Sequence, residues 1–248
     1  MNLMRDLLVD GGVAVGTAGG LGSEVPFLAD AGFDFLIFDT QHSPVEIKQL
    51  AGPIASIRRR HATPIVRVGD NNAEQICYAL DQGAKGIIAP MVNTPEQAED
   101  MVQSCKYPME GVRSNAGPRG EWGEFKSYRE YMDIVNRDVL IIPMVETQEA
   151  MDNLEAIVKT PGVNCCLIGP SDLSINLDVP LDYTNQKYLD ALDRVGSTCR
   201  ENDVAPGMYF VPPGIEPSVL IEKGFQFFTL AWNGWAKEGI QKGIASIR

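Results

Sequence analysis

The stretch "FLIFDTQHSP" (residues 35–44) changes within a few residues from an apolar strand to a polar segment. Its first four residues are apolar on both faces of the expected strand, which is typical of a strand that is covered on both sides. Asp39, Gln41 and His42 follow at once, and Pro44 ends the strand. A carboxylate, an amide and one of only two histidines therefore stand at the end of a buried strand.

Seven further short apolar runs recur along the chain, at residues 13–16, 64–68, 86–91, 140–145, 164–169, 206–210 and 227–231. Each run is too short for a helix, and several are bounded by Gly or Pro, so we predict that they are strands. Amphipathic segments lie between the runs. One of these has Asn93 or Thr94 as its N-cap and Pro95 at its first helical position, which predicts a helix.

Eight strands that alternate with helices imply parallel pairing through right-handed crossovers. The length of 248 residues is typical of one closed (β/α)8 barrel, and we predict a single TIM-barrel domain over residues 1–248. A doubly wound open sheet is the alternative. The glycines of "GTAGGLG" (16–22) lack the spacing and the downstream acid of a dinucleotide-binding fingerprint, which favours a loop after the first strand.

The charge of the chain excludes one class of partner. A formal net charge of -12 repels phosphodiester backbones, so we expect no nucleic-acid binding. No apolar run is long enough to span a bilayer and the N-terminus is charged, so we expect neither membrane association nor a signal peptide. The five cysteines match no zinc spacing, and we interpret them as reduced thiols of a cytoplasmic protein.

Polar side chains stand at the carboxyl ends of four of the predicted strands. Besides the segment after residue 38, Arg67 lies in the third strand, Glu146 follows the fifth, and Ser171 and Asp172 follow the sixth. Active sites of TIM barrels lie at this end of the strands, which we call the mouth. Each residue alone also has a structural explanation: a strand ion pair for Arg67, or a helix-start acid for Glu146 or Asp172. Their coincidence at one mouth favours a site.

The carboxylates at the mouth indicate a metal. Two carboxylate ligands with waters are what Mg²⁺ or Mn²⁺ use, while substrate oxygens fill the remaining positions. No Cys/His cluster predicts a structural zinc. Lys85 precedes the fourth strand and is expected at the opposite end of the barrel, which disfavours Schiff-base chemistry.

Five segments together resemble the HpcH/HpaI aldolases: "AGFDFLIFDTQHSP", "PIVRV", "GAKGIIAPMVNTPEQAEDMVQSCKYPMEGVRS", "VETQEAMDNLEAI" and "GVNCCLIGPSDLS". The resemblance covers about residues 12–235 and includes a D-x-x-H motif, a strand arginine, V-E-T and G-P-x-D-L. The family comprises class II pyruvate aldolases, such as 4-hydroxy-2-oxoheptanedioate aldolase and 2-dehydro-3-deoxyglucarate aldolase. The motifs are specific for the family and weak for the substrate.

The resemblance implies a (β/α)8 barrel that cleaves 2-keto-4-hydroxy acids reversibly to pyruvate and an aldehyde. It implies a divalent metal, Mg²⁺, Mn²⁺ or Co²⁺, held by Glu146 and Asp172. It implies that His42 is the acid/base, oriented by Asp39, and that Arg67 binds the keto oxygen of pyruvate. The implied substrate-binding residues are Arg67, Gly169, Ser171 and Asp172.

The resemblance also implies an assembly, and the chain departs from the family pattern at three positions. Family members form homohexamers, as trimers of dimers, and exchange their last helix, which would be residues 234–248 here. Gln41 stands where the family usually has Glu, which removes a charge from beside the metal. Met144 replaces a common Gln, and Ser114 replaces a Gly in a loop that we expect to shape the mouth.

Two alternatives to a pyruvate aldolase stay open. A related carbon–carbon lyase acting on an acyl-CoA would need a basic patch for the nucleotide. The chain offers only "RRRH" (58–61), which we interpret as a solvated helix end. The other alternative is a non-catalytic keto-acid-binding barrel, which only the departures at Gln41 and Met144 support.

Overall fold

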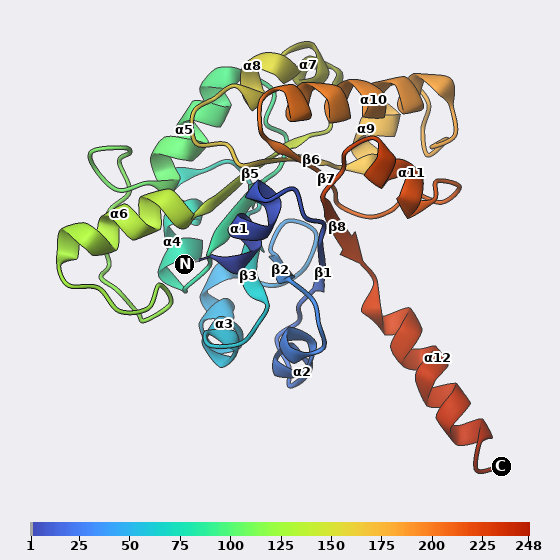
Figure 1. Cartoon of the computed structure of the whole chain (residues 1–248), viewed down its shortest axis with the longest axis horizontal. Coiled ribbons are helices and arrows are strands. Elements are labelled where there is room, and N and C mark those ends of the chain that lie inside the picture. Colours follow the sequence, from blue (N-terminus) through green and yellow to red (C-terminus); the bar gives the residue numbers. More distant parts are fainter. Residues whose placement is uncertain (1) are drawn as a thin grey trace.

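Eight parallel strands pair in chain order and close into a barrel in the computed structural model, which describes residues 2–248 (Figure 1). The strands are β1 (Ala14–Ala18), β2 (Phe35–Asp39), β3 (Thr63–Arg67), β4 (Gly86–Ala89), β5 (Leu140–Val145), β6 (Cys165–Ile168), β7 (Ala205–Met208) and β8 (Phe227–Leu230). Each lies within two residues of a run that the sequence predicts. The (β/α)8 barrel is confirmed, and the open doubly wound sheet is wrong because β8 pairs with β1.

Helices precede and follow the strands, and all but the last of them pack around the barrel. They are α1 (Leu3–Val9), α2 (Glu24–Asp30), α3 (Ala51–Ile57), α4 (Ala73–Asp81), α5 (Pro95–Cys105), α6 (Tyr128–Asp138), α7 (Gln148–Asp152), α8 (Leu154–Val158), α9 (Pro170–Asn176), α10 (Gln186–Glu201), α11 (Pro217–Glu222) and α12 (Trp232–Ala245). The predicted start of α5 is confirmed with Thr94 as the N-cap. The Thr94 side chain accepts from the Gln97 N–H, and the Gln97 side chain accepts from Thr94 in return.

The core has two layers because successive side chains of a strand point to opposite faces. Leu36 and Phe38 face outward and join the large cluster between the barrel and the helices. Phe35 and Ile37 face inward and join a smaller cluster that fills the barrel. The same alternation carries the next inward position of β2, Asp39, to the mouth.

The long segment between α5 and α6 lies at the opposite end of the barrel from the mouth. Arg113 Nη2 donates to Asp81 Oδ1, at the end of α4, over 3.0 Å. Lys85 Nζ lies 5.3 Å from the ring centroid of Trp122, immediately before β4 begins. The placement of Lys85 is therefore as predicted. The expectation that the loop with Arg113 and Ser114 shapes this barrel's mouth is wrong, because Arg113 is held among residues at the amino ends of the strands.

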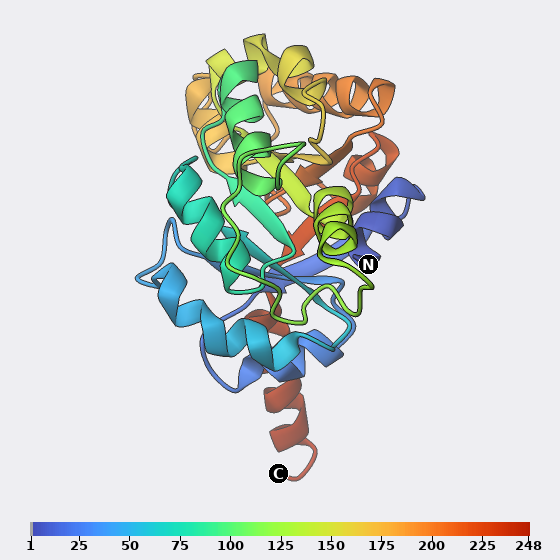
Figure 2. The same ribbon diagram turned by 90° about the vertical axis from the view of Figure 1, so that its left-hand side faces the viewer.

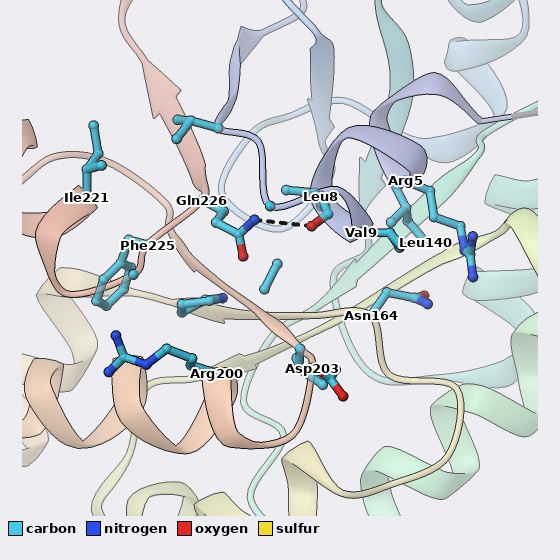
Figure 3. A pocket seen from close by; sticks show the side chains of 16 residues that line it. Arg5, Leu8, Val9, Leu140, Asn164, Arg200, Asp203, Ile221, Phe225 and Gln226 are labelled. Carbon is cyan, nitrogen blue, oxygen red and sulfur yellow. Dashed lines mark hydrogen bonds between the residues drawn. The ribbon is translucent and has the colours of Figure 1, made fainter.

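The amino ends of the strands also border a cavity of about 530 Å³, between α1 and the ends of α10 and α11 (Figure 3). Gln226 spans its edge, and its Nε2 donates to the carbonyl of Leu8 over 3.1 Å. None of the predicted site residues lines this cavity. Concavity alone therefore does not locate the chemistry of this barrel. Within residues 2–248, no helix is both long and apolar enough to cross a bilayer.

The last helix, α12, projects away from the barrel instead of covering it (Figures 1 and 2). No side chain of α12 is buried. Trp235 and Ile240 are 54% and 62% exposed, although both are large and apolar. The helix therefore presents apolar surface that the chain itself does not cover.

The fold makes one position inside the barrel intolerant of any side chain. The rings of Phe35 and Phe227 stack with centroids 4.2 Å apart, and a Cβ at Gly16 would lie 2.2 Å from the Phe35 ring. We expect Gly16→Ala to lower the free energy of unfolding by about 1–3 kcal/mol through overpacking. Urea unfolding followed by circular dichroism measures this. Gly52→Ala, on α3 with open space around it, is the control and should be neutral or stabilising; equal losses would contradict the packing account.

Candidate active site

Charged side chains lie just above the apolar residues that fill the barrel, because they occupy the next inward-facing positions of the strands. Arg67 follows inward Ile65 by two residues in β3, and Glu146 follows inward Met144 by two. Arg67 is 5% exposed and Glu146 is 2% exposed, so both charges are almost fully withdrawn from water. Burying a charge costs free energy unless the group is paired or binds a ligand, so the partners of both groups decide what the mouth can do.

Arg67 is held by Asp39 through two parallel hydrogen bonds. Its Nε donates to Oδ1 over 2.8 Å and its Nη2 donates to Oδ2 over 2.6 Å. Burial alone would raise the pKa of Asp39, but the hydrogen bonds and charge of Arg67, with backbone N–H groups of residues 41 and 42, hold that pKa below its usual value. The pair uses one edge of the guanidinium and leaves Nη1 outside the Asp39 contact.

The segment after β2 is fixed by its backbone. The Gln41 N–H donates to Asp39 Oδ1 over 3.0 Å, and the Ser43 hydroxyl donates to the Asp39 carbonyl. Thr40 donates through both its N–H and its hydroxyl to the Arg67 carbonyl. His42, between these anchors, is exposed to solvent. The Asp39 oxygens thus contact Arg67 and backbone amides, whereas the family resemblance implies that Asp39 orients the histidine.

Tyr209 is a site residue that the sequence reasoning missed. The guanidinium carbon of Arg67 lies 4.1 Å from the centroid of the Tyr209 ring, which is a cation–π contact. Burial raises the pKa of Tyr209 to about 12, although the charge of Arg67 acts in the opposite direction. The signal was available, because Tyr209 directly follows the last residue of β7, at the same end of the barrel where Arg67 ends β3. Asp39 and Tyr209 together fix the plane of the guanidinium.

Glu146 accepts a hydrogen bond from the backbone, but within residues 2–248 it forms no ion pair with a cationic side chain. Its Oε1 accepts from the Met91 N–H over 2.8 Å, and Met91 adopts a left-handed φ of 54° just after β4. Burial raises the pKa of Glu146, and the nearby Asp172 carboxylate raises it further; the Met91 N–H and Arg67 oppose this without reversing it. A buried carboxylate beside a second carboxylate is a site that positive charge would stabilise.

Gly169 makes room for the Glu146 carboxylate. A Cβ at Gly169 would lie 1.9 Å from Glu146 Oε2 and 3.1 Å from the Met144 methyl carbon. Only glycine therefore fits here, which explains this residue in the G-P-S-D motif. Met144 itself is 1% exposed and belongs to the barrel filling directly below Glu146. The floor of the site is apolar at this point.

The start of α9 contributes Ser171 and Asp172. Gly169 is the N-cap and Pro170 is the first helical residue, so the N–H groups of Ser171 and Asp172 have no acceptor within the helix. The Ser171 hydroxyl lies 3.3 Å from the Tyr183 hydroxyl. Asp172 is exposed, and the Asn176 amide links its carbonyl to that of Glu146. The first turn of α9 thus stands beside the buried carboxylate.

The residues at the mouth fit a divalent cation with few protein ligands. Within residues 2–248, no three Cys, His, Asp or Glu side chains converge as a complete protein-ligand set. Glu146 and Asp172 are two carboxylates close enough to raise a pKa, and Mg²⁺ characteristically uses one or two carboxylates with waters and substrate oxygens. The Gln41 Oε1 atom is buried without a hydrogen-bond donor, so an acceptor also remains available near this site.

Comparisons with known proteins agree with this arrangement. A family model described as HpcH/HpaI aldolase/citrate lyase matches residues 25–236. The chain is 30% identical to a hydroxypyruvate/pyruvate aldolase of Roseovarius nubinhibens, over 71% of this chain and 69% of that protein. It is 29% identical to the 4-hydroxy-2-oxo-heptane-1,7-dioate aldolase of Salmonella typhimurium, over 84% of this chain and 80% of that one.

A solved structure extends the likeness to the whole chain. The crystal structure of an HpcH/HpaI aldolase/citrate lyase family protein from Burkholderia cenocepacia is 28% identical, covers 100% of both chains and superimposes with a TM-score of 0.86. The resemblance seen in the sequence motifs is confirmed, since the family match includes β2 to β8 and with them every residue of the mouth described above. The chain belongs to the HpcH/HpaI aldolase/citrate lyase family, whose named relatives here are aldolases.

Proposed function

We propose that the chain, as one barrel domain, is a divalent-metal-dependent aldolase that cleaves 2-keto-4-hydroxy acids reversibly to pyruvate and an aldehyde. The observation that carries this proposal is the buried Arg67, clamped by Asp39 and Tyr209 beside the buried Glu146. Such a site offers fixed positive charge where an enolate oxygen develops. The names of the relatives, which are aldolases of pyruvate or of keto acids, support the same class of substrate.

The keto acid is bound by groups that the barrel already fixes. Arg67 donates to the keto oxygen from the part of its guanidinium that Asp39 does not use. The N–H groups of Ser171 and Asp172, at the start of α9, donate hydrogen bonds to the carboxylate of the keto acid. Because the guanidinium is held on two sides, it loses little freedom when the substrate binds.

Glu146 and Asp172 would hold the metal. When bound, a divalent cation acts as a Lewis acid that polarises the keto group. Such polarisation typically stabilises the charge of the transition state by several kcal/mol. The buried Glu146 needs such a charge more than the exposed Asp172 does, because its pKa is raised by burial and by its neighbour. The mouth residues named above offer carboxylate oxygens and include no cysteine, since the free thiols lie elsewhere in the chain. Oxygen ligands suit a hard ion such as Mg²⁺ or Mn²⁺.

His42 moves the proton. In the cleavage direction, His42 takes the proton of the C4 hydroxyl and the C3–C4 bond breaks. The electron pair of that bond moves into the keto group and forms the enolate that Arg67 stabilises. Protonation of C3 then yields pyruvate, and the aldehyde leaves. An exposed histidine at the rim suits this role because imidazole is the side chain that most often transfers protons in catalysis, and the solvent-facing position leaves it free to reach the substrate.

The position of the basic stretch argues against a lyase acting on an acyl-CoA. Residues 58–61 follow α3 and precede β3, so they lie at the amino ends of the strands, away from the mouth. The nucleotide of an acyl-CoA bound to these residues would lie at the opposite end of the barrel from Arg67. A non-catalytic binder would not need the exposed His42 next to a clamped arginine, and relatives named as enzymes further favour catalysis.

We also propose that the chain is a cytoplasmic homohexamer, a trimer of dimers in which α12 is exchanged. The helix that follows β8 leaves the wall of its own barrel uncovered between α2 and α11 (Figure 1). Phe27 on α2 is 66% exposed and Ile221 on α11 is 46% exposed, so both helices carry large apolar side chains that the chain does not cover. A second copy of α12, with Trp235 and Ile240, supplies matching apolar surface.

The first test is pyruvate release from a panel of 2-keto-4-hydroxy acids with Mg²⁺, Mn²⁺ or Co²⁺ and with chelator. We expect activity only with metal. Glu146→Gln should lower kcat/KM by about 10²-fold or more, as losing transition-state charge stabilisation typically does. Glu149→Gln, an exposed neighbour on α7, is the matched control and should keep full activity. Full activity in excess chelator would show that the reaction needs no divalent metal and would contradict the proposed metal site.

The second test separates proton transfer from enolate stabilisation. Oxaloacetate decarboxylation forms the same enolate but has no C4 hydroxyl to deprotonate. His42→Ala should lose about 10²–10⁴-fold in aldol cleavage and much less in decarboxylation. Arg67→Lys should lose both, because an ammonium cannot pair with Asp39 in a bidentate way and also reach the substrate. Equal losses of both activities in His42→Ala would show that His42 is no acid/base.

The third test concerns α12. Light scattering should give a hexamer for the full chain, and a smaller species for Trp235→Glu combined with Ile240→Glu, because charges would replace the apolar contact surface. Gln241→Glu, which adds a negative charge to the same helix on the side away from Trp235 and Ile240, is the control and should stay hexameric. A monomeric wild-type protein would contradict the exchange.

A further inference from the structure

We propose that a second site, at the opposite end of the barrel from the mouth, binds a small anion that carries two or more phosphate groups. The site is the basic pocket, defined by Arg58, Arg59, Arg60 and Arg119, which line a hollow of about 720 Å³. This proposal is independent of the proposed aldolase function. It concerns a stretch, "RRRH", that the chemistry of the mouth does not use.

Two distant segments build the basic pocket. The first three arginines follow the end of α3 at Ile57, directly before β3. Arg119 arrives from the long segment between α5 and α6, which runs to this end of the barrel. Gly120, in a left-handed conformation with φ of 84°, lies beside the first of these arginines, since a Cβ there would be 4.0 Å from Arg58 Cδ, in van der Waals contact. Residues some sixty positions apart thus share one hollow by tertiary packing.

The pocket contains more positive charge than its neighbours neutralise. Arg60 is paired with Asp30, and its Nε donates to the Ser56 carbonyl over 3.1 Å. For the guanidinium groups of Arg58, Arg59 and Arg119, by contrast, no hydrogen bond or ion pair occurs within residues 2–248. The Arg58 Nε atom is also buried without an acceptor. An unpartnered buried donor is unfavourable, and an anion in the pocket would satisfy it.

Stabilisation of the α3 helix end explains only part of this cluster. Cations near a helix C-terminus interact favourably with its dipole, which accounts for Arg60 and its Ser56 contact. It does not account for Arg119, which comes from another segment and adds repulsion. The chain has 33 acidic residues against 21 basic ones, so carboxylate partners are not scarce. Gathering three unpaired arginines here points to an external anion.

The chemistry of the pocket selects the class of ligand. Guanidinium groups match phosphate oxygens with two parallel hydrogen bonds, and three unpaired groups favour more than one phosphate. The ligand is small, because the net charge of -12 disfavours approach of a long polyanion such as nucleic acid. The pocket is also remote from Arg67, so occupation does not require the substrate site.

Isothermal titration of the full-length protein with inorganic pyrophosphate, without added divalent metal, tests the site. We expect saturable binding of one pyrophosphate per chain and weaker binding of inorganic phosphate. Arg59→Ala and Arg119→Ala should each raise Kd by about tenfold or more, the usual effect of losing a charged hydrogen bond. Arg119→Lys should lose less, because the charge remains. Both positions are exposed, so the variants should unfold at the wild-type temperature.

Two controls make the outcome decisive. Arg194→Ala removes an exposed arginine on α10, outside the pocket, and should bind pyrophosphate like the wild type. Arg67→Ala should also bind like the wild type, since the mouth is not involved. The proposal is overturned if wild-type binding does not saturate, if Arg194→Ala weakens binding as much as Arg119→Ala, or if Arg67→Ala abolishes it.

Discussion

Side chains of the strands point alternately into and out of the barrel, and the interior must be filled. The positions of Asp39, Arg67 and Glu146 follow from that constraint. Inward side chains of the strands pack against one another, so a charged inward residue is tolerated only beyond the last apolar layer. Asp39 and Arg67 occupy such positions on adjacent strands and are directly paired in the strand register. Their two hydrogen bonds withdraw both charges from water without leaving either unpaired. The mouth can therefore keep a fixed arginine directly above the apolar filling of the barrel.

The two carboxylates of the site differ because their surroundings differ. Glu146 is buried against Gly169 and accepts from the Met91 N–H, while Asp172 is exposed on the first turn of α9. Burial and the neighbouring charge act together on Glu146, which makes it the group most in need of a cation. Below it, Met144 gives the site an apolar floor. A polar acceptor is available elsewhere, because the buried Gln41 Oε1 atom has no hydrogen-bond donor within residues 2–248.

The opposite end of the barrel has a different character. There Arg113 is buried in an ion pair with Asp81 and lies over the Tyr107 ring, 4.6 Å from its centroid, which holds the long segment in place. The same segment brings Arg119 to the arginines that follow α3. Residues that look alike in the sequence, as exposed or loop arginines, thus have separate roles: Arg113 fixes the segment, and Arg119 adds charge to a pocket.

The sequence by itself determined the strands and the barrel, because short continuous apolar runs and turn residues are local signals, and it determined the family through its motifs. It also placed Arg67, Glu146 and Asp172 at strand ends. It did not determine pairings: that Asp39 binds Arg67, that Tyr209 lies over the guanidinium, or that the long segment packs away from the mouth. Only the tertiary structure decided these, because closure of the barrel sets which inward side chains meet across it, and no local pattern encodes that distance.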